Sequence, residues 1–302
     1  MTDVTGQQDI RGINIDTLAK GFADEDLVIT PLVTVLSTNA RENRWFQKTA
    51  GFLTGTTTTG ITSSLGYNIA EKTAPSVIEP SYTRNTSYVL KFMFDSPLVS
   101  VEDIQDSTPD VLGNIIRDVT RAVGYQKELH IWNVMTESQS PSTINYFATT
   151  SVGGDQWDAA SYAGNPIADI NRAIRLIRDY SYNVEGNGFI IMNPQAHEIL
   201  KTWLIAGKGS SIPNFSSTAV QNGVVMQILG LDVIVSTQAT ADYALVGIRK
   251  KAVTYYEFSP MNAQVIRDGA FTGIGVKFRC WTNGVAVLTD PKALCLITDI
   301  LT

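Results

Sequence analysis

Cysteine and charge are scarce in this sequence. Its 302 residues include two cysteines, and charged residues make up 17% of the chain. Two cysteines cannot build a disulfide framework, and because Cys280 and Cys295 lie in apolar, strand-like runs, we expect both to be buried free thiols. Soluble domains usually carry about 25% charged residues. The shortfall predicts that partners, in the simplest case further copies of the chain, cover much of its surface.

An excess of basic residues and long apolar runs are also missing. The net charge of -6 and the pI near 5.0 argue against tight, unspecific binding of nucleic acid, which depends on clustered Lys and Arg. The first twenty residues contain no apolar core, and no apolar run is long enough to span a bilayer. We therefore expect no secretory signal and no membrane partner, and we expect the protein to be made in the cytoplasm of its producing cell.

Residues suited to catalysis or metal binding are few. The two histidines, His130 and His197, have no neighbour at metal-ligand spacing. His197 precedes Glu198 as in zinc proteases, but Lys201 stands where the second histidine belongs. Gly273-Ile274-Gly275 lacks the third glycine of a dinucleotide-binding loop, so close backbone approach in a strand explains it better. We expect no catalytic residue, no cofactor and no metal; a hydrolase using His197 and a nearby carboxylate is kept as an alternative.

What the chain does have is apolar content. Hydrophobic residues make up 44% of its 302 positions. A chain of this length lies near the size at which a single hydrophobic core divides into two. We therefore expect one polypeptide with two packed lobes.

The amino-terminal part shows no element with a convincing period. Residues 1–50 contain an acidic run, Asp24-Glu25-Asp26, followed by an apolar run, Leu27–Leu36, that Pro31 interrupts. A segment of this kind cannot form a core alone. It predicts an arm that lies across another surface.

Residues 51–94 predict a protruding hairpin with an irregular tip. Its first half contains a stretch, 54–64, that is almost entirely Gly, Thr and Ser. Its second half, Thr83–Phe94, alternates with period two and carries bulky residues on both faces. Pro75 and Pro80 lie between the halves and forbid a continuous central strand. Limbs of about 15 to 20 residues would reach roughly 50 to 65 Å.

Three helices have strong start signals. Thr108-Pro109-Asp110 supplies an N-cap, a first-turn proline and an acid, and the apolar stripe that follows continues to about Met135. A helix of roughly 26 residues is near 40 Å long and would form the spine of one lobe. Asn165-Pro166 and Asn193-Pro194 begin two further helices, and the strand Gly188–Met192 lies between them.

The last third predicts a sheet. A hairpin turn is expected at Asn283-Gly284, between alternating apolar residues that end at Cys280 and the run Val285–Leu288. The fold class is therefore α+β. Further strands are expected at Val224–Ile228, Val233–Ser236, Ala244–Ile248 and Ala252–Phe258.

This order of elements resembles the major capsid proteins of tailed phages and related archaeal viruses, whose fold is shared with encapsulin compartments. The resemblance covers nearly the whole chain. It rests on the order and spacing of the arm, the extended loop, the turn Ser96–Ile104 before the spine helix, the segments Phe189–Pro194 and Leu229–Ser236, and the closing strands with Phe278-Arg279 and Asn283–Val287. It implies an N-terminal arm at 1–50, an extended loop at 51–94, a peripheral domain with the spine helix at 95–145, an axial domain at 146–250 and return strands of the peripheral domain at 251–302.

The resemblance implies a structural, non-enzymatic protein. Copies of the chain would assemble as hexamers and pentamers into an icosahedral shell, located in the virion and assembled in the host cytoplasm. The shell would enclose double-stranded DNA without sequence-specific binding, with portal and scaffolding or decoration proteins as partners. An encapsulin-like cargo compartment is the first alternative. A monomeric carbohydrate- or peptide-binding module is another, which the low charge and long hairpin disfavour.

Assembly would bury the apolar residues of the arm and the hairpin, which have no core of their own. The basic turn Arg249-Lys250-Lys251 could contact an acidic neighbouring subunit or nucleic acid, or be solvated. The expected contacts between subunits are Leu27, Val28, Ile29, Trp45, Phe46, Phe52, Tyr67, Ile78, Tyr82, Tyr88, Arg249, Lys250 and Lys251.

Overall fold

The structure of the chain is a computed structural model with mixed α and β elements. It forms two compact units, each of which collects segments from distant parts of the sequence. Within the described residues, the first unit takes 27–43, 87–100, 111–131, 255–268 and 275–287, and the second takes the remainder. The structure describes residues 27–48, 71–72, 82–100, 111–152, 154–160, 163–204, 227–268 and 275–302.

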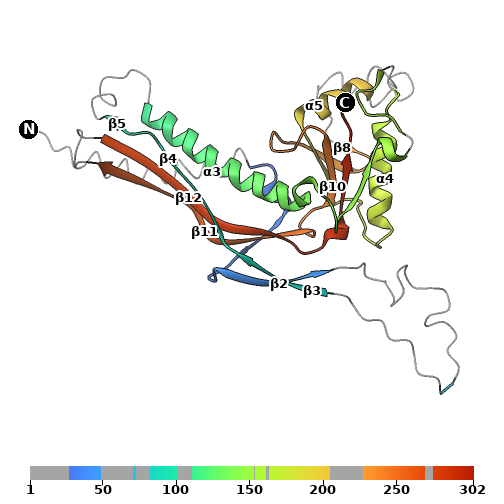
Figure 1. Cartoon of the computed structure of the whole chain (residues 1–302), viewed down its shortest axis with the longest axis horizontal. Helices are drawn as coiled ribbons and strands as arrows, with labels where there is room; N and C mark the ends of the chain where they lie inside the picture. The colour runs from blue at the N-terminus through green and yellow to red at the C-terminus, as the bar shows by residue number, and fades with distance from the viewer. Residues whose placement is uncertain are drawn as a thin grey trace, which may run out of the picture. The chain divides into compact units, whose positions relative to one another are not determined.

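A long sheet and a long helix make up the first unit (Figure 1). The helix is α3 (Val111–Met135), whose last four residues are counted with the second unit. The strand order is β1 (Thr34–Ser37), β11 (Val253–Asp268), β12 (Gly275–Leu288) and β4 (Leu90–Asp95), and β5 (Val99–Ser100) also pairs with β12.

The apolar stripe of α3 forms the core of this unit. Ile116, Val119 and Val123 recur at helical spacing and pack in one cluster with Phe278 and Cys280 of β12. The helix has 25 residues and ends at Met135, as the sequence predicts. Its predicted start at 108–110 lies outside the described residues.

The predicted strand Thr83–Phe94 is divided in two. β3 (Tyr82–Tyr88) pairs with β2 (Glu42–Lys48) as a separate ribbon, whereas β4 joins the long sheet. The break falls at Val89, whose N–H donates to the carbonyl of Arg41 at 2.9 Å. The Asn85 side chain donates to the Gln47 side chain at 3.4 Å. Residue 89 thus lies beside 41 and residue 85 beside 47, so the two strands of the ribbon are antiparallel. The rest of the predicted hairpin, 51–70 and 73–81, lies outside the described residues.

The predicted turn at Asn283-Gly284 is wrong. β12 runs straight through it, and Asn283 and Gly284 pair with Lys91 and Leu90 of β4. A glycine is needed at position 284 for another reason: a Cβ there would lie 2.2 Å from the hydroxyl oxygen of Tyr255. Gly284 therefore makes room for a buried ring, and its backbone does not turn.

The second unit is built on a six-stranded mixed sheet (Figure 1). The central strand β7 (Gly188–Met192) is flanked by β10 (Tyr243–Ile248), which is antiparallel to it, and by β9 (Leu231–Val235), which is parallel. The strand order is β6 (Asn145–Ala148), β13 (Leu294–Thr298), β10 (Tyr243–Ile248), β7 (Gly188–Met192), β9 (Leu231–Val235) and β8 (Gln227–Ile228).

The two asparagine-proline signals begin helices as predicted. Asn165 accepts a hydrogen bond from the Ala168 N–H and begins α4 (Pro166–Arg178), which packs against β13, β10 and β6. Asn193 accepts from the Gln195 N–H and begins α5 (Pro194–Thr202). Short 3₁₀ helices lie at Thr30–Leu32, Glu137–Gln139, Thr150–Val152 and Pro291–Ala293.

Several smaller predictions are also decided. Both cysteines are free and buried, as expected. The strand predicted at Ala252–Phe258 is the beginning of the 16-residue β11, and residues 224–226 of another predicted strand lie outside the described ranges. At Gly275 a Cβ would lie 2.6 Å from the Leu98 side chain, whereas Gly273 and Ile274 of the predicted close backbone approach lie outside the described residues. Among the described residues, no helix is long and apolar enough to cross a membrane.

Candidate assembly surfaces

The ribbon of β2 and β3 exposes aromatic side chains. Phe46 on β2 is 62% exposed, and Tyr82 and Tyr88 on β3 are 56% and 67% exposed. Trp45, beside Phe46 in sequence, is half-buried. Four of the expected contact residues thus lie on the two strands of the ribbon, Tyr88 in the part counted with the first unit and the other three in the part counted with the second. Exposed aromatic side chains of this kind suit contact with a protein partner.

The expected contacts at the amino-terminal side divide. Val28 is exposed and Leu27 is half-buried, but Ile29 is 0% exposed and belongs to the core of its own unit. The Ile29 side chain therefore offers no surface to another copy. Phe52, Tyr67 and Ile78 lie outside the described residues.

The basic turn, 249–251, is part of the second unit, and two of its side chains contact other residues of that unit. Arg249 forms an ion pair with Asp232 at 2.6 Å. The Lys251 ammonium lies 4.6 Å from the centre of the Tyr182 ring. Lys250 is exposed, and its backbone has a positive φ of 54°. Arg249 and Lys251 are therefore already engaged by groups of the same chain.

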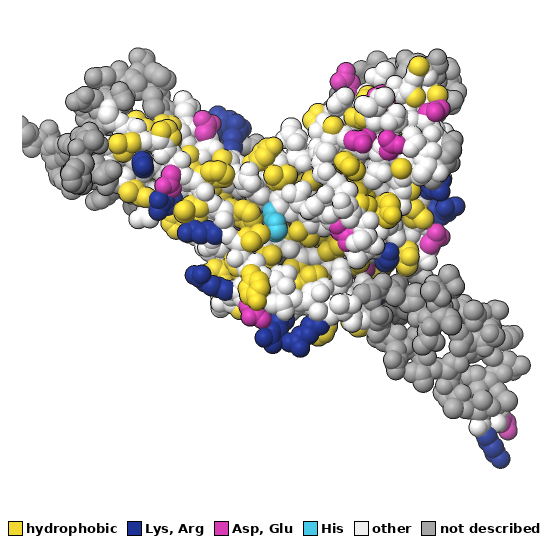
Figure 2. Space-filling view, in the orientation of Figure 1, with side chains coloured by type: hydrophobic (Ala, Val, Ile, Leu, Met, Phe, Trp, Pro, Cys, Tyr) yellow, Lys and Arg dark blue, Asp and Glu magenta, His cyan; other side chains and the backbone are white. Residues whose placement is uncertain are grey.

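Further exposed apolar side chains lie on and beside β4. Leu90, Met93, Phe94 and Leu98 are each exposed by about two fifths, with Leu90 and Phe94 on one face of the strand and Met93 on the other. These residues are not among the predicted contacts, although the alternation of bulky residues on both faces of 83–94 is the signal that could have found them. Figure 2 shows hydrophobic side chains (yellow) interspersed with lysines and arginines (dark blue) over the region of the long sheet.

The outer edge of β4 carries the charged residues Lys91 and Asp95. The Ser96 N–H donates to Phe278 of β12, so the alternating backbone groups of Lys91, Met93 and Asp95 point away from β12. Asp95 pairs with Arg279 at 2.6 Å, and this hydrogen bond holds the pKa of Asp95 below its usual value. Charged residues at an edge discourage the addition of foreign strands. The surface therefore favours side-chain contact over strand pairing.

Residues just after the amino-terminal acidic run are seated on α3. The Glu128 carboxylate, 3% exposed, accepts the Ile29 N–H at 2.7 Å and the Thr30 N–H at 3.4 Å. One turn earlier, Gly124 leaves room for Leu27, whose Cδ2 lies 3.4 Å from where a Cβ would stand. Burial raises the pKa of Glu128, and the backbone N–H donors and Lys127 oppose the shift. A buried carboxylate on α3 thus holds the backbone at residues 29 and 30 against the helix.

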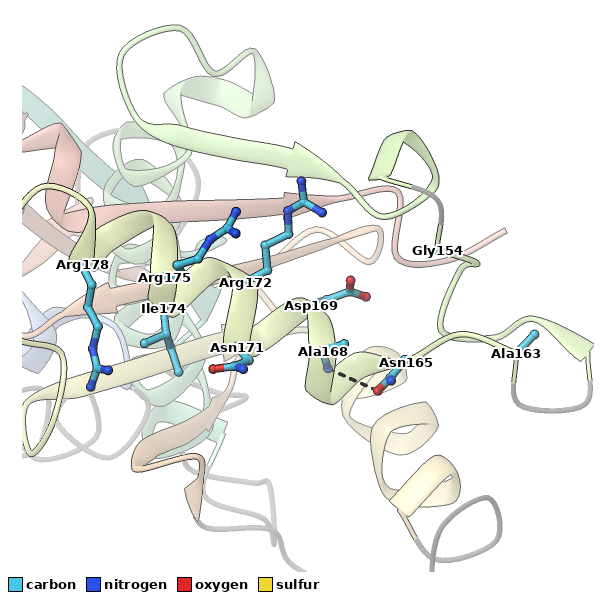
Figure 3. A pocket seen from close by; sticks show the side chains of 10 residues that line it. All are labelled: Gly154, Ala163, Asn165, Ala168, Asp169, Asn171, Arg172, Ile174, Arg175 and Arg178. Atoms are coloured by element: carbon cyan, nitrogen blue, oxygen red, sulfur yellow. Dashed lines mark hydrogen bonds between the residues drawn. The ribbon is translucent and has the colours of Figure 1, made fainter. Parts of the chain in front are cut away.

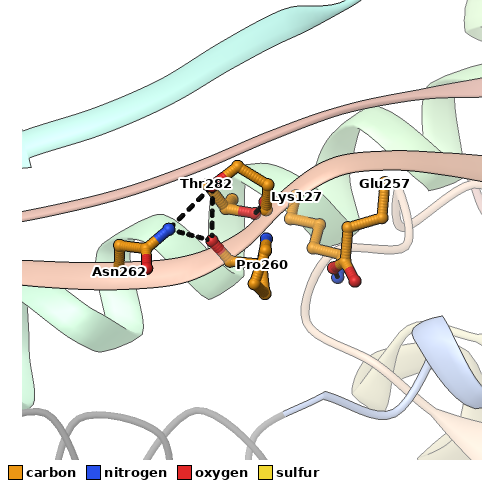
Figure 4. A network of polar contacts seen from close by, with 6 residues as sticks. Lys127, Glu257, Pro260, Asn262 and Thr282 are labelled. Atoms are coloured by element: carbon orange, nitrogen blue, oxygen red, sulfur yellow. Dashed lines mark hydrogen bonds and ion pairs between the residues drawn. The ribbon is translucent and has the colours of Figure 1, made fainter. Parts of the chain in front are cut away.

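A second polar network links α3 to β11 and β12 (Figure 4). Lys127, also buried, pairs with Glu257 at 3.4 Å, and its ammonium lies 4.6 Å from the centre of the Tyr255 ring. Further along the sheet, Asn262 donates to the Ser259 hydroxyl, and the Thr282 hydroxyl donates to the Ser259 carbonyl. These contacts fix the helix and strands of the first unit to one another.

The base of the ribbon is fixed in the second unit by Tyr182. Its hydroxyl donates to the carboxylate of Asp290, at 2.6 and 2.8 Å from the two oxygens, and accepts from the Lys48 ammonium at 3.2 Å. Lys48 is the last residue of β2, and its N–H also donates to Thr289. Burial, with the adjacent Asp290, raises the pKa of Tyr182 well above its usual range. The phenol is therefore neutral and joins the ribbon to the unit.

An open hollow of about 700 Å³ runs along α4 (Figure 3). Arg172, Arg175 and Arg178 line it at intervals of three residues, together with Asn171. Asp169 also lines the hollow, but its carboxylate accepts the indole N–H of Trp157 at 2.9 Å, and burial raises its pKa. The hollow therefore presents more positive than negative charge.

The two histidines have different surroundings. His130 Nε2 accepts the Ala286 N–H at 3.1 Å, and burial lowers its pKa, so it is a neutral structural acceptor. Burial also lowers the pKa of His197, with Lys201 contributing, and its Nε2 has no hydrogen-bond partner among the described residues. Across those same residues, no group of three or more His, Cys, Asp or Glu could hold a metal ion.

Sequence comparison decides the family. The family model described as phage capsid protein matches residues 98–297, which is more than half of the chain. The chain belongs to the phage capsid protein family. No curated protein matches the sequence. As a member of this family, the capsid protein is a structural component of a viral shell.

Solved structures agree with this fold. The capsid structure of the cyanophage P-SCSP1u is similar with a TM-score of 0.64 at 12% identity, covering 90% of this chain and 88% of that one. A virus-like particle from Pyrococcus furiosus is similar with a TM-score of 0.60 at 11% identity, covering 95% of this chain and 99% of that one. The mature capsid of bacteriophage PhiM1 is similar with a TM-score of 0.60 at 10% identity, covering 89% of this chain and 85% of that one. At such identities the likeness shows the fold, and it confirms the predicted α+β phage capsid fold.

Proposed function

We propose that this capsid protein assembles with copies of itself, as pentamers and hexamers, into an icosahedral shell that encloses double-stranded DNA. The observation that carries the proposal is the β2–β3 ribbon, which contains no buried hydrophobic side chain and exposes Phe46, Tyr82 and Tyr88. Full burial of one large apolar side chain contributes about 1.5–3 kcal/mol. Contacts of this size, repeated around a closed ring of identical subunits, accumulate into a stable shell.

The anchoring of the ribbon supports a contact role. Lys48, Tyr182 and Asp290 hold its base, so its aromatic residues are presented on a fixed support. A preordered surface loses less conformational entropy on binding than a free loop. The ribbon therefore combines an exposed apolar surface with a low cost of ordering.

The remaining parts of the proposal concern partners and location. The net charge of -6 suits a wall that encloses DNA without gripping it, because clustered cations are what bind phosphate tightly. Portal, scaffolding or decoration proteins are proposed as partners, with assembly in the host cytoplasm and no enzymatic activity. From the described part of the chain we retain as contacts five exposed residues, Val28, Phe46, Tyr82, Tyr88 and Lys250, and two half-buried ones, Leu27 and Trp45.

A protein compartment without a genome is the second candidate. The likeness to a virus-like particle from Pyrococcus furiosus, which covers nearly all of both chains, favours keeping it. Particle content separates the two. Nuclease-resistant double-stranded DNA would support the genome-enclosing shell, and a packaged enzyme with no DNA would support the compartment.

A triple substitution tests the assembly role of the ribbon. Phe46→Ser, Tyr82→Ser and Tyr88→Ser together should leave circular dichroism and monomer folding unchanged and abolish particles in negative-stain micrographs. Tyr146→Ser is the matched control, because Tyr146 is an exposed tyrosine on β6 of the second unit. Normal particles from the triple variant would show that the ribbon does not carry assembly.

A further inference from the structure

The hollow along α4 holds cations that the chain itself does not fully satisfy. Arg175 is exposed, and its side chain has no hydrogen-bond or ion-pair partner among the described residues. Arg172 lies with its guanidinium 5.2 Å from the centre of the Phe147 ring, and its buried Nε has no acceptor in the same part of the chain. Figure 3 shows both side chains extending on the same side of α4. The two guanidinium groups therefore present donors in a common direction.

The nearby carboxylates leave guanidinium donors of the hollow available to bind an anion. One Asp169 oxygen, Oδ2, accepts the Trp157 indole N–H. Burial raises the pKa of Asp169, while Trp157 and the charge of Arg172 oppose the shift, so Asp169 is a weaker counter-charge than an exposed aspartate. Glu185 pairs with Arg178, and the two side chains are 73% and 47% exposed. Figure 3 shows the Arg178 side chain extending to the side of α4 opposite to Arg172 and Arg175. The donors available to an incoming anion are therefore those of Arg172 and Arg175.

The shape of the hollow favours a segment over a small ion. A space of about 700 Å³ is far larger than one phosphate or carboxylate group. The small residues Gly154, Ala163 and Ala168 form part of its lining, and Asn171 adds an amide that can donate or accept. Guanidinium groups bind carboxylates through two parallel hydrogen bonds. The site thus suits a chain that carries acidic side chains.

We propose that the α4 hollow is an interface that binds a carboxylate-bearing segment of a second copy of this chain. The occupant is argued from charge: 29 Asp and Glu stand against 23 Lys and Arg, so each neighbouring copy offers an excess of carboxylates. The inference rests on the proposed self-assembly and names one of its contacts. It adds a charged contact in the second unit to the apolar contact of the ribbon.

A charge series at Arg175 tests the contribution of the arginines. Arg175→Glu should lower the yield of sedimenting particles at least tenfold, Arg175→Gln should have a smaller effect, and the matched control Arg175→Lys should retain most of the yield. Thermal unfolding of the monomer should not change, because Arg175 is exposed. Raising the salt concentration should reduce particle yield more in the wild type than in Arg175→Gln. Normal particle yield from Arg175→Glu would overturn the inference while leaving the proposed function intact.

Photo-crosslinking identifies the occupant. A benzophenone amino acid at Asn171 places the probe in the hollow and leaves the three arginines in place. Particles assembled from mixed light and heavy isotope-labelled subunits should give mixed-label adducts, with the label on a peptide that contains Asp or Glu. Adducts to DNA, adducts within one chain, adducts to a peptide without acids, or no adduct would each overturn the inference. A wild-type chain that forms no particles would instead overturn the proposed function on which it rests.

Discussion

β7 and β3 are strands of similar length in one chain, and they differ in what covers them. All five residues of β7 are buried, with a strand on each side. β3 has seven residues and none of them is buried. The first strand therefore obtains its stability from its own chain, whereas the second exposes two tyrosine rings, which we propose a neighbouring copy covers. If so, folding and assembly depend on different residues, and substitutions should separate them.

The core strand should show the largest effect on folding. Ile190→Ala in β7 removes a completely buried side chain between two neighbouring strands. The expected loss is about 2–5 kcal/mol of the free energy of unfolding, from lost burial and the cavity left behind. Urea denaturation followed by circular dichroism measures it. A loss below about 1 kcal/mol would mean that the site collapses around the smaller residue and that β7 is less critical than its burial indicates.

The anchor of the ribbon should come next. Tyr182→Phe keeps the ring beneath Lys251 but leaves the buried carboxylate of Asp290 without its phenolic donor. We expect a loss of about 1.5–3 kcal/mol, typical of hydrogen bonds to charged groups. Hydrogen exchange of β2 amides should also accelerate, because Lys48 loses its acceptor. Lys251→Met is the control: it removes a charge over the same ring and should cost less.

The contact of Glu128 with the backbone of residues 29 and 30 should have a smaller effect on the free energy of unfolding, and this effect should depend on pH. Glu128→Gln keeps an oxygen that can accept the Ile29 N–H, so we expect a loss of about 1 kcal/mol or less near neutral pH. Because burial raises the pKa of Glu128 in the folded state, protonation favours the folded form. The wild type should therefore gain stability relative to Glu128→Gln as pH falls through the raised pKa toward the usual 4.5. Unfolding curves at several pH values test the sign; a relative loss on acidification would contradict it.

The sequence predicts elements well where local chemistry and burial agree. Asn165-Pro166 and Asn193-Pro194 begin helices because a side-chain cap and a proline act within one turn. Gly188–Met192 is a strand with the predicted bounds, because an apolar run between turn residues has few other uses. Such signals are local, so they can be interpreted without knowledge of the tertiary contacts.

Predictions fail where a distant residue decides. Asn283-Gly284 has the composition of a hairpin turn, but the ring of Tyr255 occupies the space beside Gly284 and β4 pairs along the strand. Ile29 lies in a segment whose composition predicts an exposed arm, but its side chain is buried and its N–H donates to Glu128, 99 positions away. The α4 hollow was not foreseen either, because its arginines become a site only once α4 and the loop around Gly154 are folded.

The ribbon should show the smallest effect on folding and a full effect on assembly. Tyr88→Ser alone removes a ring that is 67% exposed, so the free energy of unfolding should change by less than about 0.5 kcal/mol. Particle yield should nevertheless fall, because the same ring is lost from every contact around each closed assembly. Analytical ultracentrifugation measures the particle fraction, and urea denaturation of the monomer measures stability. Equal losses in both would mean that Tyr88 contributes to the fold, and the separation of core and ribbon would then fail at this residue.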